Sequence, residues 1–261
     1  SGSHGTNGFY LDFSNVGTIH PLTVVGTTQH KTAVKKIGAS SIYFDAGTTD
    51  LHTTSTGSQW AFGTGDFTVE CWIYPQITSG DPMIMGNTYG SYSATSTLWR
   101  LYINQSTSTL KYGNSSAVLL TSSSTISNST WTHIAVTRQS GTVRMYLNGV
   151  QDVTASDSGD LSGVRSFFLG DGFDGGTWLG YIDEVRVSKN CRYPDGTTFT
   201  AFGQGGGTIS SPTPFEDDSN TIILIHSDTS DTSTTFVDSS GVTGALGNDS
   251  SGEDNHLPPA N

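Results

Sequence analysis

The sequence predicts an all-β protein in which two antiparallel sheets pack as a sandwich. The first observation is alternation: in residues 67–74 the side chains of Phe67, Val69, Cys71 and Ile73 fall on one face, as in a half-buried strand. The second is the short spacing of turn residues between such segments. The third is composition, because 32 glycines and only 13% charged residues do not suit helix bundles.

The first part of the chain contains four expected strands. Residues 9–13 (FYLDF) and 21–26 (PLTVVG) are short runs of aromatic and β-branched residues, which favour extended backbone. Residues 40–45 (SSIYFD) form the third and end in a glycine-containing turn. The fourth, residues 63–75, ends at a proline, which cannot donate a hydrogen bond to a neighbouring strand. Its second face carries Glu70 and Tyr74.

The second part continues the pattern with hairpins. A polar turn pairs residues 98–103 with 109–112, and Ser-Gly and Asn-Gly turns set the limits of the segment 142–147. Further strands are expected at 131–138, 167–169, 180–193 and 221–226. In residues 180–193, alternation is expected to turn the adjacent Asp183 and Glu184 to opposite faces.

Composition limits the partners. The net charge of −12 argues against nucleic acid, and the longest apolar run, residues 222–225, is too short to enter a membrane. Cys71 and Cys191 either form a disulfide or remain two buried thiols. We divide the chain into a main domain at 9–204, a Gly/Ser/Thr/Pro linker at 205–218 and a C-terminal extension at 219–261, which either packs on the main sandwich or reaches a neighbour.

A family resemblance rests on six segments in order: SSIYFDAGTTDL, GDFTVECWIYP, WTHIAVTR, GTVRMYLNGV, SFFLGDG and GYIDEVRVSK. Their succession resembles the laminin-G-like, concanavalin A-like jelly-roll domains of phage and bacterial surface or tail proteins. The resemblance implies a two-sheet antiparallel jelly roll that binds carbohydrate or protein, often with calcium. On the same resemblance, residues 219–261 look like the start of a further unit.

Acidic residues are the candidate ligands for a structural calcium ion. The resemblance implies that Asp183, on the last strand of the main domain, pairs with an acidic residue near the first strand, and Asp12 is the candidate. Asp45 and Asp50 flank one turn and form a second candidate pair. Carboxylate oxygens suit Ca²⁺. The alternatives are that Asp183 accepts backbone N–H bonds or pairs with Arg186, and that the turn aspartates cap their own backbone.

Loop aromatics beside polar residues are the candidates for a glycan site. Trp178 follows a loop that contains Asp171 and Asp174, which are also candidates for a rim cation, and Tyr89 and Tyr92 lie in a second loop. An aromatic ring can stack on a sugar while a carboxylate binds its hydroxyls. The alternative for Trp178 is packing at the end of the sandwich, and Trp131, in a strand, is expected in the core.

Catalysis is not expected. Glycosidases of this superfamily carry carboxylates at alternate positions of one strand, whereas Glu70 has no such partner in its segment. The sequence therefore predicts a non-catalytic carbohydrate-binding or adhesion module, calcium-assisted, on a phage virion or an extracellular bacterial surface. Its partner would be a glycan, a cell-surface or virion protein, or neighbouring copies. The alternative is a structural, decoration or spacer module of a phage particle that binds no glycan.

Overall fold

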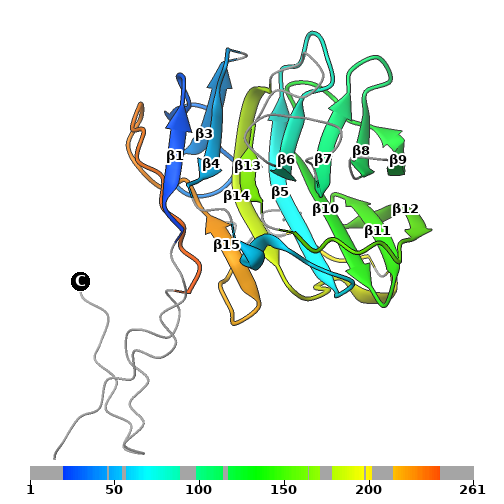
Figure 1. Ribbon diagram of the computed structural model, residues 1–261. Helices are drawn as coiled ribbons and strands as arrows, with labels where there is room; N and C mark the ends of the chain where they lie inside the picture. Colours follow the sequence, from blue (N-terminus) through cyan, green and yellow to red (C-terminus); the bar gives the residue numbers. More distant parts are fainter. Residues whose placement is uncertain are drawn as a thin grey trace, which may run out of the picture.

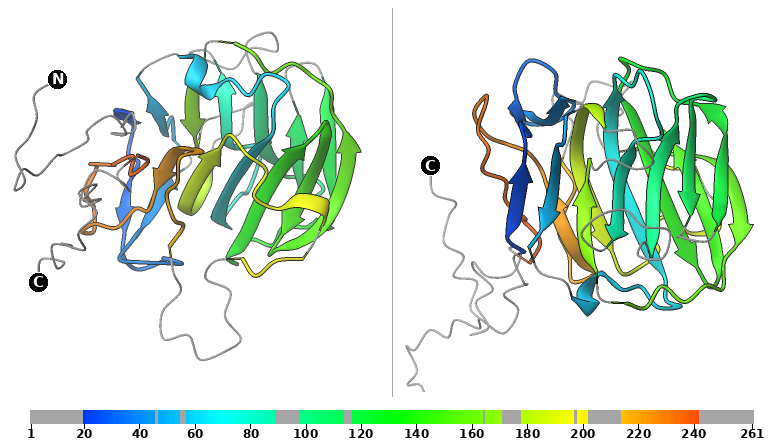
Figure 2. Two further views of the ribbon diagram at one scale, coloured as in Figure 1. Left: turned by 90° about the horizontal axis from the view of Figure 1, so that it is seen from below. Right: turned by 45° about the horizontal axis from the view of Figure 1, so that its top comes forward.

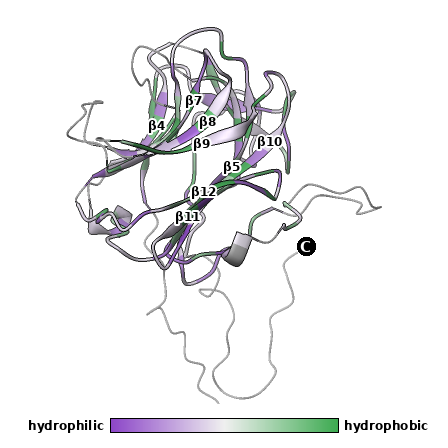
Figure 3. Ribbon diagram, turned by 90° about the vertical axis from the view of Figure 1, so that its right-hand side faces the viewer, coloured by the Kyte–Doolittle hydropathy of each residue, from purple (hydrophilic) through white to green (hydrophobic). Residues whose placement is uncertain are grey.

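A computed structural model describes residues 20–45, 47–54, 57–88, 98–113, 117–163, 165–170, 178–196, 198–201 and 214–241. These residues form two antiparallel sheets packed face to face (Figure 1). Figure 3 views the sandwich from the side, with β7, β8 and β9 in the upper layer and β11 and β12 in the lower. The predicted all-β sandwich is confirmed.

The first sheet contains seven strands, named here in spatial order. They are β1 (Leu22–Val25), β4 (Asp50–Thr53), β13 (Ser166–Leu169), β6 (Met83–Thr88), β7 (Trp99–Asn104), β8 (Thr109–Gly113) and β9 (Val118–Thr125).

The second sheet has a path of seven strands with one more attached to it. Along the path lie β12 (Val150–Ser156), β11 (Thr142–Leu147), β10 (Thr132–Gln139), β5 (Phe67–Pro75), β14 (Leu179–Ser188), β3 (Ser41–Asp45) and β2 (Gln29–Lys31), and β15 (Thr221–Ile225) pairs with β14. The described helices are two short 3-10 turns, η1 (Ser58–Trp60) and η2 (Pro194–Gly196). Within the described residues no helix has the length and apolar character needed to cross a membrane.

The main core fills the space between the sheets. The apolar face of β5 supplies Phe67, Val69, Cys71 and Ile73, all with no exposed surface. Ring stacking fixes part of this packing, since the ring centroids of Phe62 and Phe67 lie 4.5 Å apart. The thiols of Cys71 and Cys191 are both free, and burial raises the pKa of Cys71 well above its usual value. Both thiols are therefore free, as in the second alternative, but only Cys71 is buried and Cys191 is partly exposed.

The C-terminal segment 214–241 is part of the sandwich. One edge of β14 pairs with β3 through residues 179–182 and with β15 through residues 185–188, so β15 continues the sheet where β3 ends. Ile223 and Ile225 of β15 are buried in the main core. Figure 2 shows β15 in orange beside β14, and the orange chain after it runs along β1. Of the two alternatives for the extension, its described part packs on its own sandwich.

A β-bulge in β14 corrects the expectation for Asp183 and Glu184. The pairing of β14 with β5 shifts register between Asp183 and Arg186, and Glu184 has a positive φ of 50°. The side chains on either side of this pair, Ile182 and Val185, both point into the main core. A bulge adds one residue to a strand and interrupts its alternation, so both carboxylates lie on the outer face of the sheet.

Described segments of the chain cover part of that outer face, which we call the covered half. A second hydrophobic cluster forms there from Ile37, Trp72, Ala201, Phe215 and Leu224. Beneath it the Glu70 carboxylate is fully buried and accepts hydrogen bonds from Arg186. The sequence predicts the polar face of β5 correctly, but residues far along the chain exclude water from part of it.

Candidate functional site

A row of four aromatic side chains crosses the second sheet beside the second hydrophobic cluster, on the part of the outer face that none of the described residues covers. Tyr43 of β3 lies opposite Tyr181 of β14, and Tyr181 lies opposite Tyr74 of β5. The ring centroids are 4.9 Å apart in the first pair and 5.7 Å in the second. Trp131, which directly precedes β10, completes the row with its ring centroid 5.5 Å from that of Tyr74. We call these four residues the aromatic row.

The strand pattern explains why the three tyrosine rings face outward. Each tyrosine stands next to a fully buried residue of the main core, namely Ile42, Ile73 or Ile182. Because successive side chains of a strand alternate between faces, the tyrosines take the outer face. Antiparallel pairing then aligns them, since directly opposed residues are close enough for ring contact.

All four rings are partly open to solvent, in contrast to the other tryptophans. The structure assigns Tyr43, Tyr74, Trp131 and Tyr181 intermediate exposure. Trp60, Trp72, Trp99 and Trp178 are each at most 1% exposed. Trp131, expected in the core, instead packs its ring partly against the second cluster. Partly exposed aromatic rings in register are the feature that distinguishes this face.

Polar side chains border the row. Gln29 of β2 lies opposite Tyr43 and extends the row at its end. Asp45 lies two residues after Tyr43 and opposite Leu179 of β14. The Leu179 carbonyl accepts a hydrogen bond from the backbone N–H of Gln76, which lies two residues after Tyr74. By alternation, Asp45 and Gln76 share the face of the row. Carboxylate and amide groups are therefore available next to the rings.

The second long side of the row is closed by the covered half of the sheet. Trp72 lies two residues before Tyr74 and is buried, with the Lys36 ammonium 4.2 Å from its ring centroid. Asp183, opposite Trp72, is also buried. Within the row, burial raises the pKa of the Tyr181 hydroxyl, and the nearby hydroxyls of Tyr43 and Tyr74 add to the increase. The rings thus stay neutral and form a shelf with one closed side.

The acidic residues proposed for calcium have separate partners in the structure. The Asp183 carboxylate accepts backbone N–H bonds from Lys36 at 2.8 Å, Ile37 at 3.1 Å and Glu184 at 3.0 Å, which is one of the alternatives considered for it. Burial raises its pKa well above the usual value, against the effect of these donors. Asp12 lies outside the described residues.

Asp45 and Asp50 are likewise engaged separately. Asp45 accepts the backbone N–H of Gly47 at 3.1 Å, and Asp50 lies 2.5 Å from Nδ1 of His52. The two residues belong to different sheets, at the end of β3 and the start of β4. Among the residues that the structure describes, no three His, Cys, Asp or Glu side chains converge as a metal site requires. Asp45 and Asp50 thus have separate hydrogen-bond partners, and the calcium site stays a prediction.

The predicted glycan-binding loops lie largely outside the described residues, which exclude Tyr89, Tyr92, Asp171 and Asp174. The strands that carry these loops are described. Ser166 lies opposite Thr88, and Leu169 lies opposite Met85. The last residues of β6 and β13 are therefore at opposite ends of this antiparallel pair. Trp178 is 0% exposed, which leaves no ring face for a sugar, so the packing alternative is the one observed for it.

Glu70 is enclosed rather than presented to a substrate. Arg186 donates to its Oε1, the Tyr193 hydroxyl donates to its Oε2 at 2.6 Å, and Nε2 of His133 lies 3.3 Å from the same oxygen. Although burial opposes the change, Arg186 and then His133 and Tyr193 lower the pKa of Glu70 to about 2. A carboxylate held this way stays ionised and has no proton to give.

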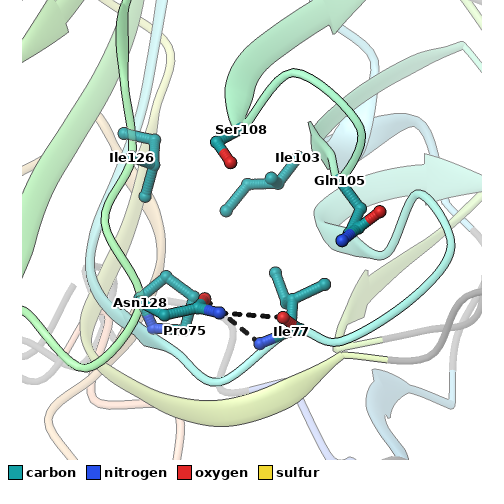
Figure 4. Close-up of a pocket in the computed structure, with 7 residues that line it drawn as sticks. All are labelled: Pro75, Ile77, Ile103, Gln105, Ser108, Ile126 and Asn128. Atoms are coloured by element: carbon teal, nitrogen blue, oxygen red, sulfur yellow. Dashed lines mark hydrogen bonds between the residues drawn. The ribbon is translucent and has the colours of Figure 1, made fainter.

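A small pocket opens near the end of β5, between the two sheets (Figure 4). Its volume is about 50 Å³, room for one or two water molecules and too little for a sugar ring. The Asn128 amide bonds both backbone groups of Ile77, at 3.2 Å to the N–H and 2.8 Å to the carbonyl. The lining residues are Pro75, Ile77, Ile103, Gln105, Ser108, Ile126 and Asn128. The aromatic row is the better candidate site.

Comparison with known proteins agrees with this architecture. A family model described as the concanavalin A-like lectin/glucanases superfamily matches residues 45–196, more than half of the chain. Among the curated proteins, no sequence matches the chain.

Two examples from the solved structures with a similar fold are an arabinanase domain and a sialidase. Domain 4 of AbnA, an extracellular arabinanase of Geobacillus stearothermophilus solved with arabinotriose, aligns with a TM-score of 0.54 and 20% identity over 72% of this chain and 91% of that one. A Trypanosoma rangeli sialidase solved with 2,3-difluorosialic acid aligns with a TM-score of 0.50 and 11% identity over 68% of this chain and 30% of that one. At these identities the likeness concerns the fold, and the predicted jelly roll is confirmed.

Proposed function

The chain belongs to the concanavalin A-like lectin/glucanases superfamily, and we propose that it is a non-catalytic carbohydrate-binding module. The observation that carries the proposal is the aromatic row. Four partly exposed rings lie in register across neighbouring strands, where each can pack against the C–H face of a sugar. Large aromatic residues of this kind supply contact area at low entropic cost.

The surroundings of the row suit sugar hydroxyls. The tyrosine hydroxyls and the side chains of Gln29, Asp45 and Gln76 combine donors and acceptors. The site is an open shelf, and Glu70, the carboxylate considered for catalysis, is fully buried. On an open surface a glycan is held by many contacts along its length, which suits binding without bond cleavage.

The comparisons support the proposal at a coarse level. The arabinanase domain named above was solved with an oligosaccharide, so a similar fold serves a binding module in another protein. We extend the proposal to an extracellular setting, on a bacterial surface or a phage virion. We further propose that calcium assists binding through acidic residues outside the described part of the chain, where Asp12, Asp171 and Asp174 lie.

A glycan array tests the proposal directly. We expect the protein to bind a subset of glycans, and we expect Tyr74→Ala and Trp131→Ala each to reduce the signal. Val150→Ala is a suitable control, because Val150 is 54% exposed on β12, the strand at one end of the sheet order. Binding unaffected by the row variants would move the site elsewhere, and an array without any signal would favour the spacer alternative.

The calcium part of the proposal needs its own arm. The same array is read in calcium and in EDTA, together with a melting curve under each condition. An ion that binds only the folded state raises stability by RT ln(1 + L/Kd), where L is its free concentration. Equal binding and equal melting temperatures in the two buffers would remove calcium while leaving the glycan site in place.

A further inference from the structure

The geometry of the aromatic row points to a narrower class of ligand. Building on the proposed function, we infer that the row binds a single, soluble and uncharged glycan chain that lies across the strands, rather than a crystalline polysaccharide surface or an acidic glycan. Three features of the row carry this inference: its direction and spacing, the orientation of its rings, and the charges around it.

The direction of the row and the spacing of its rings define how a bound glycan would lie on the sheet. The rings come from four adjacent strands, β3, β14, β5 and the start of β10, so the row runs perpendicular to the strands. Its consecutive centroid distances of 4.9, 5.7 and 5.5 Å follow the strand spacing of roughly 4.8 Å. This spacing is comparable with the length of one sugar unit in an extended glycan. Each ring can therefore meet a successive sugar of one chain.

Ring orientation distinguishes a single chain from a crystal face. The planes of Tyr43 and Tyr181 differ by 41°, those of Tyr181 and Tyr74 by 78°, and those of Tyr74 and Trp131 by 57°. A flat crystalline surface can contact several rings at once only if they are coplanar. Neighbouring strands are rotated by roughly 20–25°, so a row across four of them cannot be flat. A free chain can rotate about its glycosidic bonds and follow these planes.

The closed side of the shelf restricts the ligand to a narrow strip. Along one long side, Ile37 and Trp72 belong to the cluster that covers the sheet, and both are buried. A wide sheet of parallel polysaccharide chains would meet this cover, whereas one chain fits beside it. The width of the row and the angles between its ring planes therefore both suit a single glycan chain.

Charge argues for a neutral ligand. Asp45 is an exposed carboxylate next to the row, and the whole chain carries a net charge of −12. Two lysines near the row are engaged elsewhere: Lys36 lies against the Trp72 ring and is only partly exposed, and Lys31 of β2 lies 3.9 Å from the Asp231 carboxylate. A glycan of uronic or sialic acids would approach a surface of its own sign, which lowers both the rate and the strength of association.

Affinity gel electrophoresis and a depletion assay with the full chain test the inference. The probes are hydroxyethylcellulose, galactomannan and arabinan as neutral soluble chains, polygalacturonate and alginate as acidic ones, and microcrystalline cellulose and chitin as insoluble surfaces. We expect retardation by at least one neutral soluble chain. Tyr74→Ala and Trp131→Ala should each weaken it about tenfold, the loss typical of a central aromatic contact, and Val150→Ala should not.

The outcomes separate the inference from the function on which it rests. Binding to a crystalline surface or to an acidic chain at equal or higher affinity, lost in the row variants, would overturn the inference and leave the carbohydrate-binding function intact. Binding to none of the probes and to no arrayed glycan would overturn both. Binding to a neutral soluble chain that the row variants do not change would place the ligand on another surface.

Discussion

Arg186 donates two hydrogen bonds to a single carboxylate oxygen of Glu70, from Nε at 2.8 Å and from Nη2 at 2.6 Å. The pair joins β14 to β5 under the covered half of the second sheet. Arg186 also donates from Nη1 to the carbonyl of Glu216 at 3.0 Å, so the pair ties the C-terminal segment to the sheet. The part of the sheet that carries the aromatic row begins just beyond this anchor.

Glu70→Gln should destabilise the protein strongly. The amide keeps the shape of the side chain but leaves the Arg186 guanidinium, 3% exposed, without its counter-charge. Removing one partner of a buried ion pair costs about 3–5 kcal/mol. Chemical denaturation measures the loss, and Glu70→Gln combined with Arg186→Met is the control, since the double variant should recover part of it. A loss in the single variant below about 1 kcal/mol would show that the pair is not an anchor.

The same pair predicts a pH dependence of folding. The pKa of Glu70 is about 2 in the folded protein and 4.5 ordinarily. A lowered pKa contributes stability that is complete above pH 4.5 and is lost as the pH falls toward 2. The difference in unfolding free energy between wild type and Glu70→Gln should therefore shrink by about 3 kcal/mol across that window. A difference that stays constant from pH 6 to about pH 2.5 would contradict the assigned pKa.

His226 should act in the opposite direction. Its Nδ1 lies 3.0 Å from both carboxylate oxygens of Glu184, and although burial opposes the change, this contact raises the pKa of His226. A raised pKa gives stability that is complete below about pH 6.5 and is lost as the pH rises through the folded-state pKa. Wild type should thus lose its advantage over His226→Gln as the pH rises above about 6.5, as followed by urea unfolding. His20 and His30 are present in both proteins, so their own titration cancels.

Ile223→Ala tests whether the C-terminal segment is integral to the domain. Ile223 has no exposed surface, and truncating a buried isoleucine costs about 2–5 kcal/mol. Val237→Ala is the matched control from the same segment, because Val237 is 58% exposed and surface changes stay within about 0.5 kcal/mol. Equal, small effects of the two variants would mean that the segment is only loosely attached.

Much of the fold could be predicted from alternation, and the failures have physical causes. Strands β5, β10, β11 and β14 have an apolar face toward the main core, which leaves a period in the sequence. The predictions omitted strands β2, β4, β6, β9 and β12. Two of these, β9 and β12, are rich in polar residues and partly exposed, and they end the two strand orders. Such strands form because a neighbour offers backbone partners, which local sequence does not reveal.

The candidate site could be predicted only in part. Alternation along residues 67–74 puts Tyr74 on the face opposite to Ile73, so the outward ring of Tyr74 has a signal in the sequence. The alignment of Tyr43, Tyr74, Trp131 and Tyr181 depends on which distant strands are neighbours, and one sequence does not give that order. The bulge at Glu184 was also missed, because nothing in the local pattern marks a glutamate that adopts a positive φ.

Quenching of tryptophan fluorescence tests the central claim most directly. Of the five tryptophans, Trp131 alone is partly exposed, and the other four are at most 1% exposed. Acrylamide should therefore quench mainly Trp131, and Trp131→Phe should remove most of that quenching. We predict that a saturating bound glycan protects Trp131 and lowers the quenching constant of wild type toward that of Trp131→Phe. A glycan that binds at saturation and leaves the quenching of Trp131 unchanged would contradict the assignment of the aromatic row as the binding site.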